Sequence, residues 1–412
     1  MDVVHERCAG LDLHKKTVVP CALVSGAEGT VDKRTRTYST MTCELEAMAD
    51  WLAELGVTHV AMEATGAYWK PIYNVLEGRF TLLVINAEHL KAVPGRKTDV
   101  KDAEWLATLL RHGLVRASFI PDRQLRELRE LTRYRTALIR ERAREVNRLQ
   151  KTLEAANIKL AAVLTDIMGV SGQRILEALT AGETDPGALA DLAHWRVQKK
   201  REALEQSLVG RLEGPLRFVV RQQLAHMHQL DGQIEECDEE VARQMRPFAE
   251  QLARLQTIPG VGPRTAEIIL AEIGPEVSRF PTAQHLAAWS GMAPGNRVSG
   301  GKRRSARTRK GSPWLKAALA EAAWAAGRCK EGYLQAQFRR LAVRRGNKRA
   351  IVAVGHSIVV MVYHLLSEGT TYKDLGNNYF DERTREASKR RAVQRLVALG
   401  YQVHLEPLPE AA

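Results

Sequence analysis

The alternation of apolar and polar positions predicts a mixed first part of the chain. Residues 7–24 hold apolar, β-branched runs interrupted by the polar segment 12–16, which predicts two strands joined by a tight turn. Beyond them the pattern predicts a third strand near 35–39, a helix over 43–55, strands at 59–63 and 81–85, and a helix over 100–112. Strands that first meander and then alternate with helices indicate an α/β domain with a mixed sheet, which we place at residues 1–121.

From residue 123 the pattern becomes helical. Leucines recur at three- and four-residue steps between arginines and glutamates, and glycine and proline are sparse apart from breaks at 169–187 and 210–215. This pattern predicts long antiparallel helices with coiled-coil character over 122–250, an arm of the kind that serves oligomerisation, and an ordinary helical bundle is the alternative. A helix-rich domain at 251–366 and a mixed tail at 367–412 complete the expected organisation.

The charge of the chain indicates a polyanionic partner. The 412 residues suffice for two or three domains, and their formal net charge is +13. Such a balance is typical of proteins that bind nucleic acid or an anionic membrane surface. The N-terminus has no apolar core of a signal peptide, and the longest apolar run, Ile351 to Leu366, is interrupted by histidine and serine and is too short for a membrane span. We therefore expect nucleic acid and no membrane partner.

The cysteines indicate a reducing compartment. There are five, they are scattered, and no two form a C-x-x-C pair. This argues against a disulfide framework and against a zinc ribbon. We expect free thiols in a reducing cytoplasm.

Four carboxylates of the first domain are candidate metal ligands. Asp12 and Glu63 each end an apolar strand, while Asp99 and Asp102 open a helix with the i, i+3 spacing that places them on one face. Oxygen ligands suit Mg²⁺, and two such ions about 4 Å apart stabilise the attacking and leaving oxygens of a phosphoryl transfer. Each acid also has a structural interpretation, as a turn residue or a helix cap. Together with the strand meander, their placement matches the RNase H-like plan.

A glycine turn in the third region is a candidate backbone-binding element. The segment Thr257 to Ala266 holds Gly260 and Gly262 directly before an expected helix, with Arg264 in its first turn. Such a turn lets backbone N–H groups approach a phosphate, and it resembles the helix-hairpin-helix element of DNA-binding proteins. An ordinary turn between helices is the alternative.

A serine lies in a strongly cationic segment farther on. Between residues 297 and 310 there is no acid, and the cations are Arg297, Lys302, Arg303, Arg304, Arg307, Arg309 and Lys310. Ser299 precedes two glycines there, which favours a mobile loop that attracts anions. A serine hydroxyl needs activation before it acts as a nucleophile, and neighbouring arginines can stabilise a pentacoordinate phosphate. Ser305 is the rival candidate, and a solvated charge run without catalytic function is the other interpretation.

Six strings in this order resemble one known family, the DEDD-type insertion-sequence transposases of the "one-ten" family. They extend over nearly the whole chain: Gly10 to Lys15, Met62 to Gly66, Lys97 to Ala103, Ile258 to Gly262, Ala293 to Arg304, and Tyr372 to Phe380.

The resemblance implies a fold and a set of roles. The first domain would be RNase H-like, similar to Holliday-junction resolvases, with Asp12, Glu63, Asp99 and Asp102 holding Mg²⁺ or Mn²⁺, and Ser299 would join covalently to DNA. A bridge noncoding RNA would pair with donor and target DNA, and homodimers or homotetramers formed through the arm would build a composite site. The expected nucleic-acid contacts are Gly260, Gly262, Arg264, Arg297, Lys302, Arg303, Arg304 and Arg307.

Two other functions remain open at this point. A purely hydrolytic junction nuclease would use the four acids alone, and its metal-dependent cleavage would survive Ser299→Ala. A non-enzymatic nucleic-acid binder would keep all its properties in Asp12→Ala.

Overall fold

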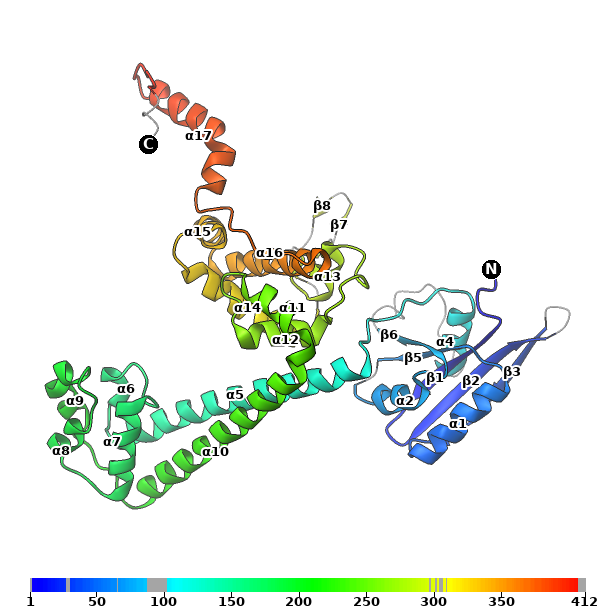
Figure 1. Cartoon of the computed structure of the whole chain (residues 1–412), viewed down its shortest axis with the longest axis horizontal. Coiled ribbons are helices and arrows are strands. Elements are labelled where there is room, and N and C mark those ends of the chain that lie inside the picture. Colours follow the sequence, from blue (N-terminus) through cyan, green and yellow to red (C-terminus); the bar gives the residue numbers. More distant parts are fainter. Residues whose placement is uncertain are drawn as a thin grey trace. The chain divides into compact units, whose positions relative to one another are not determined.

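The computed structural model separates the chain into two compact units, Met1–Pro121 and Asp122–Ala412 (Figure 1). It describes residues 2–26, 30–64, 66–86, 102–295, 298–300, 302–303, 307–308 and 310–406. The first unit is mixed α/β and the second is mostly helical. The expected mixed sheet is thus confirmed as a fold class.

The first unit is built on a six-stranded sheet. Its order is β3-β2-β1-β5-β6, with β4 also paired to β2. The pairs β1–β2 and β2–β3 are antiparallel, whereas β1–β5 and β5–β6 are parallel. The strand expected near 35–39 is divided between β3 and β4. The strands are β1 (Arg7–Leu13), β2 (Thr17–Ser25), β3 (Val31–Thr35), β4 (Tyr38–Ser39), β5 (His59–Glu63) and β6 (Thr81–Ile85).

Helices cover both faces of this sheet. On one face α1 (Thr42–Glu54) and α2 (Trp69–Leu76) enclose a core that includes Leu11 and Met62. On the other face α4 (Asp102–Arg111) packs on Cys8 and Ala61. Because side chains alternate between the faces of a strand, β1 and β5 each bury apolar residues on both faces of the sheet. The sequence pattern had not indicated α2, whose Pro71 lies in the first turn, where proline is tolerated.

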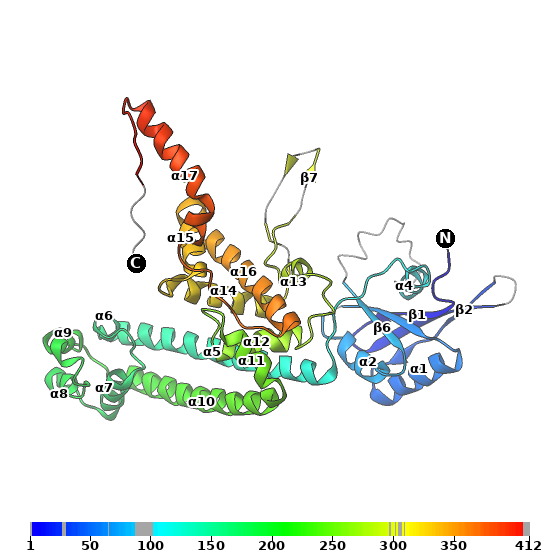
Figure 2. The same cartoon turned by 45° about the horizontal axis from the view of Figure 1, so that its top comes forward.

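The second unit contains a long antiparallel helix pair. The helices α5 (Arg123–Ala155) and α10 (Gly214–Met245) run side by side in Figures 1 and 2. A buried cluster that includes Leu138 and Ile234 joins them, and the Arg142 guanidinium donates to both carboxylate oxygens of Asp231.

A small helical cap with its own core closes the far end of this pair. The break expected at 169–187 contains the helix α7. Gly172 in the first turn of this helix lies against the backbone of Ile167, and a Cβ on Gly172 would lie 2.0 Å from the Ile167 carbonyl oxygen. The cap comprises α6 (Leu160–Val163), α7 (Val170–Ala181), α8 (Pro186–Asp191), the 3-10 helix Gln198–Lys200 and α9 (Arg201–Ser207).

The rest of the unit is a helical bundle with a short hairpin and a tail. The elements are the 3-10 helix Arg246–Phe248, α11 (Ala249–Gln256), α12 (Pro263–Ile273), α13 (Ala283–Trp289), β7 (Val298–Ser299), β8 (Lys302–Arg303), α14 (Pro313–Arg328), α15 (Tyr333–Arg345), α16 (Asn347–Glu368) and α17 (Tyr379–Ala398).

The expectation that the apolar run in α16 is too short for a membrane span is wrong. The helix extends beyond the run at both ends, to 22 residues, and passes the length and composition test for a span. In the structure 44% of its apolar window is buried, and it packs against α13, α14 and α15. Core helices behave in this way, so the test alone does not indicate a membrane.

Candidate active site

Asp12 and Glu63 lie at one edge of the sheet of the first unit. Their strands β1 and β5 are parallel neighbours, and the recorded register ends with Leu11 opposite Met62. Asp12 and Glu63 are the next residues, so their backbones lie about 4.8 Å apart across the strands. Asp12 alternates with Leu11, and Glu63 with Met62, both of which face α1 and α2. The two carboxylates therefore project from the face that α4 covers.

Gly10 brings the start of α4 to the same edge. A Cβ at this position would lie 2.3 Å from the Ala103 carbonyl oxygen and 2.4 Å from the Ala107 nitrogen, so only glycine allows this contact. The helix runs antiparallel to β1, because the Val4 N–H donates to the Arg111 carbonyl oxygen over 2.9 Å while Gly10 contacts Ala103. Asp102, the first residue of α4, consequently lies at the Asp12 end of the strand.

Three of the four predicted acids thus belong to one edge, and Asp99 lies outside the described residues. The His14 imidazole lies next to the Asp12 carboxylate, with Nε2 3.2 Å from Oδ2, and the sequence had not indicated this neighbour. Within the described residues no three carboxylate, imidazole or thiol groups are already arranged around a metal position. The donor types nevertheless fit a hard divalent cation, because carboxylate oxygens at a partly exposed edge are what such ions prefer.

Ser299 is in a different setting, at the tip of a hairpin in the second unit. It pairs with Lys302 across β7 and β8, and the intervening Gly300 has a φ of +57°, which glycine adopts readily. Closer to the bundle, the Gly295 N–H donates to the Arg307 carbonyl oxygen over 3.0 Å. Arg297, Arg304 and Ser305 lie outside the described residues. Ser299 therefore lies next to the turn of the hairpin and pairs with a strand, β8, that consists of two cationic residues.

The two ends of this loop meet where Gly311 contacts the end of α13. A Cβ at Gly311 would lie 2.4 Å from the Gly291 nitrogen and 2.6 Å from the Trp289 carbonyl oxygen. Next to it, Ser312 caps α14 and its hydroxyl donates to Glu272 Oε2 over 3.0 Å. The loop is consequently fixed at its base by backbone contact and by a side-chain hydrogen bond.

Glu272 links that base to the long arm. Its side chain is 1% exposed and receives two hydrogen bonds from Arg133 of α5, at 2.7 and 3.0 Å. Burial lowers the pKa of the neighbouring Arg129 to about 10, and the attraction of Glu272 opposes this shift. A buried carboxylate needs such partners, since an unpaired charge in the interior is costly. The sequence had not indicated this network, because Arg133 and Glu272 are 139 residues apart in the chain.

The glycine turn between α11 and α12 has both an internal and an outward side. A Cβ at Gly260 would lie 2.3 Å from the Ala322 carbonyl oxygen, so Gly260 serves close contact with α14. Arg264 forms an ion pair with Asp238 of α10. Gly262, the N-cap of α12, has open space around it. Of these three predicted contacts, Gly262 is the one free to approach a phosphate.

Comparison with known proteins identifies two matching family models. One, described as "Transposase", matches residues 9–158, and the other, "Transposase IS116/IS110/IS902 family", matches residues 252–339. Together they cover more than half of the chain. The chain belongs to the IS110 family of transposases. It is therefore a DNA transposase of an insertion sequence, and membership of this DEDD family indicates dependence on a divalent metal.

Curated relatives agree with IS110-family membership. A probable family 20 transposase of Pseudomonas aeruginosa is 24% identical over 79% of this chain and 88% of its own. The transposase for insertion sequence element IS1111A of Coxiella burnetii is 24% identical over 78% of this chain and 81% of its own. An insertion element IS116 protein of Streptomyces clavuligerus is 30% identical over 53% of this chain and 61% of its own.

Proposed function

We propose that this transposase exchanges DNA strands through a covalent bond between Ser299 and DNA, with Asp12, Glu63, Asp99 and Asp102 holding two divalent cations, Mg²⁺ or Mn²⁺. The main support is the common edge at which Asp12, Glu63 and Asp102 lie. Gly10 and the β1–β5 register bring these three acids together. The position of Ser299 at a glycine-turned tip opposite Lys302 supports the serine half.

The chemistry divides between these two groups. Ser299 Oγ attacks a phosphorus of the DNA backbone and loses its proton, a phosphoserine ester forms, and the bond to the leaving deoxyribose oxygen breaks as that oxygen takes up a proton. A hydroxyl of the incoming strand then attacks the ester and releases the serine. Bound divalent cations supply charge stabilisation of the attacking and leaving oxygens. Lys302 and the arginines near it favour the anionic transition state.

A bridge noncoding RNA that pairs with donor and target DNA completes the proposal. Sequence choice then rests on base pairing, while the protein contacts shape and backbone. Residues 1–121 form the RNase H-like domain, 122–250 the coiled-coil arm for dimers and tetramers, 251–366 the transposase domain with its helix-hairpin-helix, and 367–412 the tail. The acids of one subunit and the serine of another build one site in the bacterial cytoplasm.

The decisive experiment compares Ser299→Ala with its neighbour Ser305→Ala. Labelled DNA that stays bound to denatured protein measures the covalent species in the presence of Mg²⁺. We expect Ser299→Ala to abolish this species and strand exchange, and Ser305→Ala to retain both. Metal-dependent cleavage that is unchanged in Ser299→Ala would instead establish the hydrolytic nuclease.

A further inference from the structure

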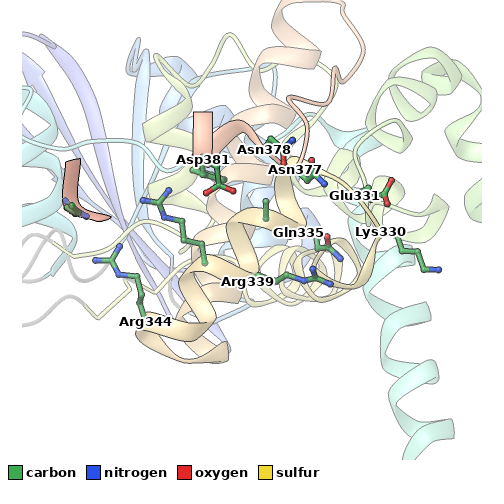
Figure 3. A pocket seen from close by; sticks show the side chains of 12 residues that line it. Lys330, Glu331, Gln335, Arg339, Arg344, Asn377, Asn378 and Asp381 are labelled. Carbon is green, nitrogen blue, oxygen red and sulfur yellow. The ribbon is translucent and has the colours of Figure 1, made fainter. Parts of the chain in front are cut away.

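A large polar cleft lies between α15 and α17, and none of the proposed active-site residues lines it. Its volume is about 1210 Å³. The helix α15 lines it through Gln335, through the adjacent Arg339 and Arg340, and through Arg344, so that each successive turn of the helix contributes to the lining. In Figure 3, Lys330 and Arg344 lie at opposite ends of this row, with Arg339 between them. Most of the residues that line the cleft follow residue 339 in the chain, where the second family match ends.

The cleft carries an excess of positive charge. Five cations line it, Lys330, Arg339, Arg340, Arg344 and Arg391, against the two acids Glu331 and Asp381. In the described part of the chain, none of Lys330, Arg339 and Arg344 has a carboxylate within ion-pair distance. Unpaired cations that converge on a cleft attract anions. The polar lining argues against a small apolar ligand, because such ligands occupy mainly hydrophobic pockets.

Side chains of the tail hold the walls of the cleft in place. The Asp374 carboxylate accepts from the Tyr333 N–H over 3.0 Å, where α15 begins, and from the Tyr372 hydroxyl over 2.9 Å. The Tyr333 ring stacks on Phe380 of α17 with centroids 5.2 Å apart, and the Arg340 guanidinium lies over the same Phe380 ring, 5.3 Å from its centroid. The aromatic rings therefore join the two helices, while Arg339 and Arg344 face the space between them.

We propose that this cleft binds the phosphodiester backbone of a nucleic acid strand. Arg339 and Arg344 are five residues, or about 7.5 Å, apart along α15, so they can hold two phosphates of the same strand. A guanidinium group donates two parallel hydrogen bonds to a phosphate. Asn377 and Asn378, at the other wall, supply amide groups of the kind that bind phosphate and sugar oxygens. The site adds a contact beyond those of the proposed active site.

Binding by the full-length double variant Arg339→Gln/Arg344→Gln tests this proposal. The probes are a mixed-sequence DNA duplex, the matching single-stranded DNA and the matching single-stranded RNA, each titrated over a range of salt concentrations. Chelator replaces divalent metal, so binding is measured without strand cleavage and independently of Ser299. We expect the slope of log affinity against log salt to become shallower by about two for the probe that occupies the cleft.

The matched control is Arg345→Gln/Arg385→Gln. It removes the same charge, one arginine from α15 and one from α17, at exposed positions that do not line the cleft. The proposal holds if the cleft variant changes the slope for at least one probe more than the control does, and the probe affected tells DNA from RNA. Equal slopes for both double variants on every probe would overturn it. Thermal unfolding at the parental temperature shows that each variant is folded.

Discussion

The carboxylate edge and the serine hairpin are fixed by different kinds of contact. At the edge, strand register and the backbone approach of Gly10 to α4 position Asp12, Glu63 and the start of α4. The hairpin has strands of only two residues, and it is held at its base by the backbone contact of Gly311 and by the buried side-chain network around Glu272. Contacts along a strand fix the residues that they join, whereas contacts at the base of a hairpin constrain its tip less. We therefore expect the backbone that carries Asp12 and Glu63 to be more rigid than the backbone that carries Ser299.

The largest effect is expected from Gly10→Ala. The new Cβ would collide with the backbone of α4, which cannot move like a flexible side chain. We expect the free energy of unfolding of the first unit to fall by at least about 3 kcal/mol and strand cleavage to be lost. Chemical denaturation and a cleavage assay measure the two results.

The control for this prediction is Gly232→Ala in α10. A Cβ at Gly232 meets nothing within 4 Å, and alanine is favoured in a helix by up to about 1 kcal/mol. This variant should be as stable as the parent or more so. If Gly10→Ala were equally harmless, the edge would not depend on backbone contact.

An intermediate effect is expected from Glu272→Gln. The amide keeps the shape and a hydrogen bond to Ser312 but removes the charge that pairs with Arg133 inside the protein. We expect a loss of about 3 kcal/mol in the free energy of unfolding of the second unit. Amide hydrogen exchange at β7 and β8 should become faster, while exchange in β1 and β5 stays as it was.

Asp231→Asn provides the comparison for Glu272→Gln. It breaks a similar ion pair with Arg142, but one that is partly exposed, so the loss should be about 1 kcal/mol or less. The rate of amide hydrogen exchange in β7 and β8 should be the same in Asp231→Asn as in the parent. If Asp231→Asn accelerated exchange in β7 and β8 as much as Glu272→Gln does, the exchange rate would depend on the overall stability of the helical unit and not on the Glu272 network.

The smallest effect is expected from Lys316→Met. Lys316 Nζ of α14 donates to Thr308 Oγ1 over 2.9 Å and so holds one side of the loop. We expect a loss of about 1 kcal/mol and a modest fall in the yield of covalent protein–DNA species. Thr308→Val should have a similar effect, and the double variant should be little worse than either single one. Additive losses would show that this contact does not act as a pair.

Much of the first unit could be predicted from the sequence because its signals are local. The alternation in β1 and β5 identified both strands, and the acids follow directly at their ends. The role of Gly10 could not be predicted in this way, since its partner Ala103 is far away in the chain. The helix α2 could not be predicted from the pattern, because it is only eight residues long and has a proline in its first turn.

The helical unit was harder to predict because its contacts join distant segments. The spacing of leucines indicated α5, but no local pattern indicates that Glu272 is buried against Arg133. The basic wall of the cleft did leave a signal that could have been used. Between Phe338 and Ala350 six cations occur without an acid, namely Arg339, Arg340, Arg344, Arg345, Lys348 and Arg349.

The length of α5 sets a distance within the second unit that can be compared with the repeat of a DNA duplex. A helix of 33 residues is about 50 Å long, which corresponds to roughly 15 base-pair steps of duplex. The cap formed by α6 to α9 sits at one end of α5, and Arg133, which pairs with Glu272, lies about 33 Å along the helix from that end. The cap and the Glu272 network are therefore separated along α5 by about one turn of the double helix, roughly 34 Å.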